Sequence, residues 1–103
     1  MTKVGFDSLI PGRPIQIDVD GKPVCLARVG DEVFAVSNVC THSYAELSDG
    51  EIKDFSIECW LHGADFDLRT GTALTLPATE PLETFQVERD GNEITISQKS
   101  KEI

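Results

Sequence analysis

Two cysteine-histidine pairs constrain this chain more than any other feature of its sequence. Cys40-x-His42 and Cys59-x-x-His62 contain both histidines and two of the three cysteines, and sixteen residues lie between the pairs. A tight loop can direct a thiolate and an imidazole that are only a few residues apart at one centre. The sequence therefore predicts a fold that brings two ligand-bearing loops together.

The chemistry of these four side chains leaves two kinds of centre open. Four ligands suffice for one tetrahedral zinc ion, or for a binuclear iron-sulfur cluster in which two cysteines hold one iron and two histidines hold the other. Zinc sites more often place both cysteines in one loop, whereas here each loop has one cysteine and one histidine, which favours the cluster. Cys25 stands alone between Val24 and Leu26, and we expect it to be a buried hydrophobic residue and not a ligand.

Length and charge narrow the class of protein. The chain has 103 residues, which predicts a single domain over residues 1–103. Nine Lys and Arg against 18 Asp and Glu give a net charge of −9, which argues against nucleic-acid binding. The sequence has no apolar run near the roughly 18 residues that cross a bilayer, and its odd number of cysteines argues against a disulfide framework. We expect a soluble, cytoplasmic protein that does not bind membranes.

Short alternating apolar runs predict an all-β fold. In "PIQIDV" (14–19) apolar and polar residues alternate, and the turn sequence "DGKP" leads into the next run, which predicts a hairpin. Further strands, separated by "GDE" and "RDGN" turn signals, are predicted at 24–29, 33–37, 82–88 and 93–98. Helical periodicity is limited to short turns after residue 8 and near residues 44–48. This pattern is typical of an antiparallel β sandwich or barrel.

The middle of the chain, residues 39–81, differs from its flanks. It holds both histidines and the only tryptophan. It ends in the passage "RTGTALTLPATEP", whose Gly, Pro and Thr residues predict irregular loops. We expect a β base built from both ends of the chain, from which a loop-rich site projects.

The motifs resemble a known signature. "CTH" followed by "CWLHGADFD" is similar to the Rieske 2Fe-2S pattern C-T-H and C-x-x-H-G-x-x-x-D, and "PATEPLETFQVERDGNEITI" resembles that family's proline-bearing loop and closing strands. The resemblance implies a Rieske-like antiparallel β sandwich or barrel base with a loop-rich cluster-binding subdomain at about 39–81. It also implies one 2Fe-2S cluster per chain, with Cys40 and Cys59 on the inner iron and His42 and His62 on the outer iron.

Departures from the pattern indicate which kind of Rieske protein this is. Respiratory Rieske proteins carry an additional cysteine in each loop, and the matching positions here are Ala45 and Leu61. Those proteins also have a serine and a tyrosine after the second loop, where this chain has Ala64 and Phe66. Hydroxyl donors stabilise the reduced cluster, so we expect a potential near the lower end of the Rieske range, about −150 mV. Trp60 replaces a proline that is common in relatives and is expected to pack against the base.

In its length and in these departures from the respiratory pattern, the chain resembles the ferredoxin components of bacterial aromatic-ring-hydroxylating dioxygenase systems. The resemblance implies a monomeric electron carrier, not an enzyme, that passes single electrons from an NAD(P)H-dependent flavin reductase to a terminal Rieske non-haem iron oxygenase. The histidine edges would form the exit for the electron, with a rim made by Ser43, Tyr44 and the loop 77–81. Acidic residues are expected to steer this tip towards basic partners, and those assigned to docking are Glu46, Asp49 and Asp65.

Three other interpretations stay open. A structural zinc module would bind other proteins and would be colourless and redox-silent. A Rieske-type small subunit would stay fixed to another oxidoreductase. A Rieske domain that has lost its cluster, as in some nitrite reductase small subunits, is disfavoured by the intact set of four ligands. Independent catalysis is not expected, because protein ligands fill every metal position and leave none for a substrate.

Overall fold

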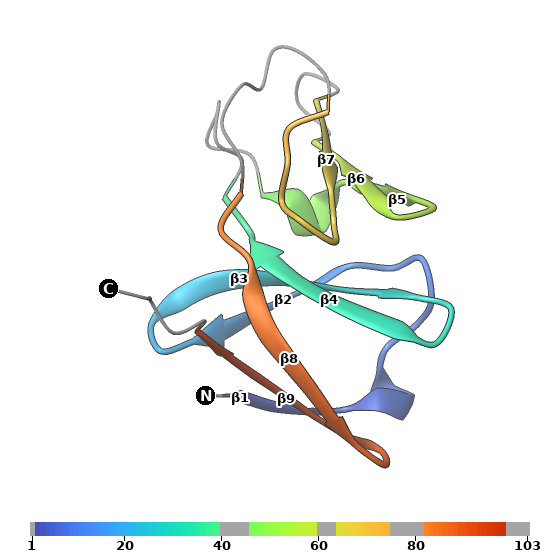
Figure 1. The fold of residues 1–103 in the computed structure, drawn as a ribbon, viewed down its shortest axis with the longest axis vertical. Coiled ribbons are helices and arrows are strands. Elements are labelled where there is room, and N and C mark those ends of the chain that lie inside the picture. Colours follow the sequence, from blue (N-terminus) through green and yellow to red (C-terminus); the bar gives the residue numbers. More distant parts are fainter. Residues whose placement is uncertain (1, 40–45, 60–63, 75–81, 99–103) are drawn as a thin grey trace.

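The computed structural model describes residues 2–39, 46–59, 64–74 and 82–98. Within these residues the fold is all-β, as predicted, and has three antiparallel three-stranded sheets (Figure 1). The terminal sheet has the order β1 (Thr2–Gly5), β9 (Glu93–Gln98), β8 (Phe85–Asp90). The central sheet has the order β2 (Ile15–Val19), β3 (Lys22–Val29), β4 (Glu32–Ser37). The small sheet has the order β5 (Glu51–Lys53), β6 (Ser56–Glu58), β7 (Asp65–Asp67).

Helical structure in the described residues is limited to two 3₁₀ turns, η1 (Phe6–Ser8) and η2 (Leu47–Asp49). The η2 turn lies at the end of the turn that was predicted near residues 44–48, of which 44 and 45 are outside the described residues. A turn at residues 11 and 12 follows residue 8, as predicted. Among the described residues, no helix has the length and apolar character needed to span a bilayer.

The hairpin predicted around "DGKP" is confirmed as β2 and β3. Val19 pairs with Lys22, so only Asp20 and Gly21 form the turn. Both have positive φ, 51° and 84°, which is the left-handed backbone of a type I′ turn and favours an Asp-Gly sequence. The strands β8 and β9 also form a hairpin at "RDGN", in which Asp90 pairs with Glu93 and the turn consists of Gly91 and Asn92.

The central sheet is buried on both faces. Along β3, Val24 and Leu26 pack on the side of the terminal sheet, whereas Cys25 and Ala27 pack on the side of the small sheet. This alternation follows from the two-residue period of a strand. Because neither face of these four residues meets water, the run "VCLA" is apolar throughout.

Two apolar clusters lie on either side of the central sheet. The base core, between the terminal and central sheets, consists of Phe6, Leu9, Val19, Val24, Leu26, Ala35, Phe85, Ile94 and Ile96. The site core, between the central and small sheets, consists of Cys25, Ala27, Val36, Leu47, Ile57, Cys59, Ala64, Phe66, Leu68 and Leu82. The base is thus built from both ends of the chain, as predicted, and the small sheet lies on the other side of the central sheet from the terminal sheet (Figure 1).

The small sheet was not predicted from the sequence, which indicated only that residues 39–81 form a loop-rich site. Its strands have three residues each, and the inward apolar side chains are Ile52, Ile57 and Phe66, one from each strand. One apolar residue per strand is too few to show a two-residue period in the sequence. The strand β1 was not predicted either, because "TKVG" is too short to show that period.

Candidate metal centre

Cys59 is the one predicted ligand within the described residues; outside them lie the other three, Cys40, His42 and His62. It follows β6 directly and is 0% exposed. Its backbone N–H donates to Ala64 O at 2.7 Å and so extends the β6–β7 pairing by one further pair. This hydrogen bond closes the second ligand loop, defined as residues 59–64. Also outside the described residues are Ser43, Tyr44, Ala45, Trp60, Leu61 and the predicted rim loop 77–81.

The first ligand loop, defined as residues 39–46, is closed at its ends as well. Val39 and Glu46 form an isolated antiparallel bridge. Directly before the bridge, Asn38 O accepts a hydrogen bond from Leu47 N–H, and Asn38 Oδ1 accepts one from Ser48 N–H, both at 2.8 Å. Asn38 is 1% exposed, so both of its oxygens accept these hydrogen bonds in the interior. The two ends of the loop are therefore held by hydrogen bonds on a buried support.

Gly50 brings the supports of the two ligand loops into contact. A Cβ atom built on Gly50 would lie 1.9 Å from Glu58 O, which is closer than real Cβ atoms approach any heavy atom. Only glycine leaves room for this approach of backbone to backbone. Because Glu58 precedes Cys59, the segment that follows the first ligand loop rests directly against the strand that leads into the second.

A second glycine anchors the chain where it returns from residues 75–81. Gly71 has φ of +79° and its N–H donates to Asp67 O at 2.7 Å. Leu82 N–H in turn donates to Gly71 O at 2.7 Å, and a Cβ on Gly71 would lie 2.3 Å from Leu82 O. The positive φ and the close approach both require glycine here. The far end of the predicted rim loop is therefore fastened to the turn after β7.

The surroundings of Cys59 are apolar. Cys59, Ala64 and Phe66 are each 0% exposed and belong to the site core. Ala64 and Phe66 stand where the high-potential Rieske proteins have hydroxyl groups, and neither side chain has one. The described part of the site therefore offers no hydroxyl at these two positions to stabilise a more negative cluster.

Cys25 is buried, as predicted. It lies on β3 within the site core and is 0% exposed. Burial raises the pKa of its thiol to about 12, because removal from water disfavours the thiolate. The ligand form of cysteine is the thiolate, so Cys25 is poorly suited to bind a metal.

The polar surface around the small sheet is predominantly acidic. Lys53 Nζ pairs with Glu58 Oε2 at 3.4 Å and Arg69 Nε with Asp67 Oδ1 at 3.2 Å. The hydrogen bond to Glu58 raises the pKa of Lys53, and the hydrogen bond from Arg69 lowers the pKa of Asp67. Among the three acids assigned to docking, Glu46 and Asp49 are exposed and Asp65 is half-buried.

The donor chemistry of the site fits an iron-sulfur cluster. Within the described residues, three or more potential metal ligands do not gather at any point, since three of the four predicted ligands lie outside. The described part shows a buried cysteine, Cys59, at the closed end of the second ligand loop. The end of the first ligand loop is anchored to the same site core through Leu47. A buried thiolate requires a cation to compensate its charge, which a metal centre supplies.

Three supporting residues were not predicted from the sequence. They are Asn38, Gly50 and Gly71. Each was visible only as an ordinary turn or loop residue. The "SDG" and "RTG" turn signals mark two of them, but a turn signal does not show which distant backbone the glycine approaches.

Comparison with known proteins assigns the family. A family model described as "Rieske [2Fe-2S] domain" matches residues 2–86. The chain therefore belongs to the Rieske [2Fe-2S] family, as its motifs predicted, and the cofactor of this domain is a Rieske-type [2Fe-2S] cluster.

Similar proteins include dioxygenase ferredoxins. The ferredoxin component of biphenyl 2,3-dioxygenase from Rhodococcus jostii (strain RHA1) is 39% identical over 97 residues, covering 93% of this chain and 91% of that protein. The ferredoxin of carbazole 1,9a-dioxygenase from Nocardioides aromaticivorans IC177 superimposes with a TM-score of 0.90 at 42% identity, covering 93% and 94%. A complex of reduced oxygenase and oxidised ferredoxin in carbazole 1,9a-dioxygenase contains a chain with a TM-score of 0.88 and 34% identity, covering 95% and 93%.

The fold is shared with a second class of small protein. A Mycobacterium tuberculosis protein described as an NADH-dependent nitrite reductase small subunit superimposes with a TM-score of 0.87 at 27% identity, covering 97% of this chain and 96% of that one. The fold by itself therefore does not separate a diffusing ferredoxin from a fixed small subunit.

Proposed function

We propose that this chain is a monomeric, cytoplasmic one-electron carrier between an NAD(P)H-dependent flavin reductase and a terminal Rieske non-haem iron ring-hydroxylating oxygenase. The observation that carries the proposal is the match in both directions to dioxygenase ferredoxin components, over 91–94% of those proteins and 93% of this chain at 39–42% identity. A single domain over residues 1–103, with a cluster-binding region at about 39–81, is part of the proposal.

The proposed ligands are Cys40 and Cys59 on one iron and His42 and His62 on the other. When bound, a [2Fe-2S] cluster supplies one-electron redox chemistry. The chain's own residues hold the loops in place: Cys59 and Ala64 close one loop mouth, and Asn38 and η2 support the other. The apolar site core excludes water from Cys59, and the two histidine ligands are the proposed route for the electron.

Charge supports a role in transient encounters. The chain has a net charge of −9, and within the described residues of the small sheet both cations are already paired with carboxylates. An acidic surface steers diffusion towards a basic partner and gives fast association that is weakened by salt. Such contacts suit a protein that must bind two partners in turn.

The first test is an electron paramagnetic resonance spectrum of the anaerobically purified, dithionite-reduced protein. The proposal predicts a rhombic signal with the low average g of a histidine-ligated [2Fe-2S] centre, together with equal iron and sulfide. A silent spectrum from folded protein that contains zinc and no iron would replace the proposal with a structural zinc module.

A second measurement separates a diffusing carrier from a fixed subunit. The reduced protein is mixed with a purified aromatic-ring dioxygenase, and cluster oxidation is followed by stopped-flow absorbance. For a diffusing carrier, the oxidation rate rises in proportion to the oxygenase concentration when that concentration is low and reaches a plateau when it is high. If the protein instead elutes permanently bound to a larger oxidoreductase chain and transfers no electrons to the oxygenase, the fixed small subunit is correct.

A further inference from the structure

The η2 turn is capped from across the first ligand loop. The first N–H groups of a helical turn have no partners within it. The residue at the N-cap of η2, Glu46, makes no side-chain cap hydrogen bond. Leu47 N–H and Ser48 N–H are accepted instead by the backbone and side-chain oxygens of Asn38, ten residues before Ser48. One residue therefore satisfies both donors and spans the mouth of the loop.

Asn38 is itself held rigidly. Its N–H donates to Pro23 O at 3.0 Å, and the preceding Ser37 N–H donates to Glu83 O at 2.8 Å. Among the described residues, Asn38 is the one polar or charged residue that is buried, with 1% of its surface exposed. An amide in the interior is costly unless it is hydrogen-bonded, so a buried Asn two residues before the predicted ligand Cys40 indicates a positional role.

The support extends from Asn38 to the second ligand loop. Gly50 N–H donates to Leu47 O at 2.9 Å and closes η2. Gly50 then lies against Glu58 O, where no Cβ would fit, and Glu58 directly precedes Cys59. Removing the Asn38 amide loosens η2, and with η2 the surface on which the approach to Cys59 rests.

We propose that Asn38 is a positioning residue for the [2Fe-2S] cluster, acting on both ligand loops through η2 and not by contact with the cluster. The inference rests on the proposed function, since it requires a cluster to position. It predicts that loss of the Asn38 side-chain hydrogen bond opens the ligand loops locally, while the base core keeps the rest of the chain folded.

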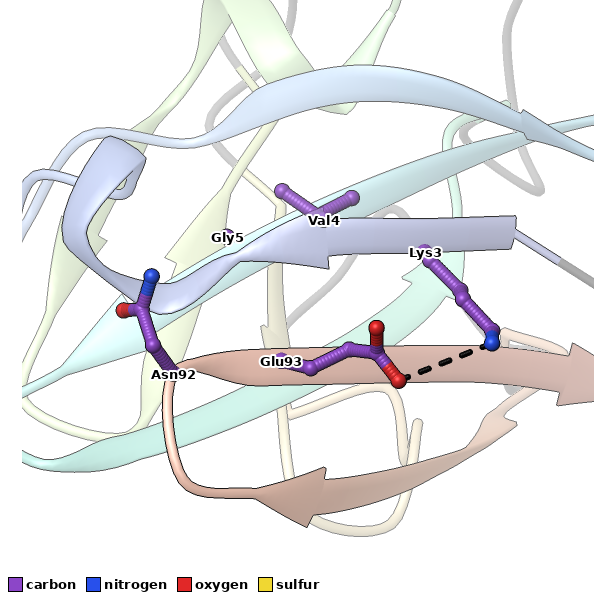
Figure 2. A pocket seen from close by; sticks show the side chains of 5 residues that line it. All are labelled: Lys3, Val4, Gly5, Asn92 and Glu93. Carbon is purple, nitrogen blue, oxygen red and sulfur yellow. Dashed lines mark ion pairs between the residues drawn. The ribbon is translucent and has the colours of Figure 1, made fainter.

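The chain contains a chemically matched control at the opposite end of the base. Asn92 caps η1 in the same manner: its backbone O accepts from Phe6 N–H at 2.7 Å and its Oδ1 from Asp7 N–H at 2.9 Å. Figure 2 shows Asn92, which directly precedes β9, together with Gly5 among the residues that line a pocket. Cys59, the predicted ligand within the described residues, does not line that pocket. Asn92 is exposed, whereas Asn38 is buried.

The experiment compares cluster loss in three holoproteins: wild type, Asn38→Ala and Asn92→Ala. Bleaching of the visible absorbance by a ferrous chelator is timed at a temperature at which far-ultraviolet circular dichroism shows each chain to be folded. The reduction potential of each is titrated as a second readout. Asn38→Ala is expected to lose its cluster roughly tenfold faster and to shift its potential, because one buried hydrogen bond is lost. Asn92→Ala should resemble wild type.

Equal rates in wild type and Asn38→Ala, or equal acceleration by Asn92→Ala, would overturn the inference. If Asn38→Ala does not fold, hydrogen exchange of the wild-type holoprotein decides: the amides of Leu47 and Ser48 must be protected like those of the core strands, and rapid exchange refutes the capping role. A wild-type protein without a [2Fe-2S] signal would instead refute the proposed function, and the inference with it.

Discussion

At the scale of single residues, the important feature near Cys59 is that the side chains of Ala64 and Phe66 have no hydroxyl group. Both side chains are fully buried in the site core together with Cys59. A hydroxyl at either position would lie in this apolar core. There it could donate a hydrogen bond to a sulfur of the [2Fe-2S] cluster or of a ligand cysteine, and such a bond favours the reduced state. The potential of the bound cluster is therefore sensitive to single substitutions here.

Phe66→Tyr is expected to raise the reduction potential. One hydrogen bond worth about 1 kcal/mol more in the reduced state corresponds to ~40 mV for a one-electron couple. The potential is measured by redox titration of the holoprotein. Phe85→Tyr, which adds the same hydroxyl at the base core, serves as the control and should leave the potential unchanged. A Phe66→Tyr potential equal to that of wild type would contradict this account of the low potential.

Cys25 is expected to resist alkylation in the folded protein. Its raised pKa of about 12 keeps it protonated between pH 8 and pH 10, where an ordinary thiol, with a pKa of about 8.5, gains most of its thiolate. The fold thus favours the neutral thiol, so this contribution to stability is complete below about pH 8.5 and is lost as the pH rises towards 12. Iodoacetamide labelling followed by mass spectrometry checks this, with urea-unfolded protein as the control; labelling of native Cys25 that quickens from pH 8 to pH 10 contradicts it.

At the scale of elements, the ligand loops depend on how closely η2 and β6 approach. The contact is made by backbone against backbone at Gly50 and Glu58, so side-chain rearrangement cannot relieve a substitution there. A side-chain contact also joins the small sheet to the central sheet, because the rings of Phe34 on β4 and Phe55 between β5 and β6 meet edge to face at 6.0 Å. Around the small sheet itself, Arg69 Cζ lies 4.9 Å from the centre of the Phe55 ring. The small sheet therefore behaves as one unit on the central sheet.

Gly50→Ala is expected to destabilise the protein by about 1–3 kcal/mol, the usual cost of overpacking, and to weaken cluster binding. The built Cβ would lie 1.9 Å from Glu58 O, so the strand before Cys59 must move. Thermal unfolding and iron content of the purified chain measure the two effects. Gly5→Ala is the matched control, because Gly5 also borders a 3₁₀ turn and its Cβ would have an ordinary 3.6 Å contact. Similar behaviour of both variants would show that the close approach is unimportant.

At the scale of the whole molecule, the central sheet separates the base core from the site core. The base core closes the molecule on one side and the site core supports the loop mouths on the other (Figure 1). Exposed acids near the loop mouths, such as Glu46 and Asp49, are therefore placed to act on partners that approach the cluster. Acids on the base contribute only to the net charge.

The double variant Glu46→Lys, Asp49→Lys is expected to slow electron transfer to a partner oxygenase about tenfold at low ionic strength, because steering is lost. The difference should shrink near 1 M salt, where the screening length falls to about 3 Å. Asp18→Lys with Glu88→Lys changes the net charge equally at exposed positions on β2 and β8 and should have little effect. Stopped-flow rates over a salt series provide the measurement, and equal slowing by both double variants would remove these acids from docking. Asp65, which is half-buried, should matter less.

The sequence by itself predicted the chemistry of the site and the strands of the base other than β1. Cysteine and histidine side chains have few other roles at the spacing of Cys40-x-His42 and Cys59-x-x-His62, and an Asp-Gly turn such as Asp20-Gly21 has a backbone requirement that is local to two residues. Two-residue periods in strands such as β2 and β9 need no knowledge of distant neighbours.

Only the tertiary structure decided how the ligand loops are held. Asn38 caps a turn ten residues away, and Gly50 is required by the carbonyl of Glu58. Neither requirement is visible in the chain around these residues, because it arises from a distant backbone that the fold brings close. The small sheet could not be predicted from the sequence for the same reason. Each of its strands, such as β6 with Ile57, gains its stability from the core that it covers and not from its own three residues.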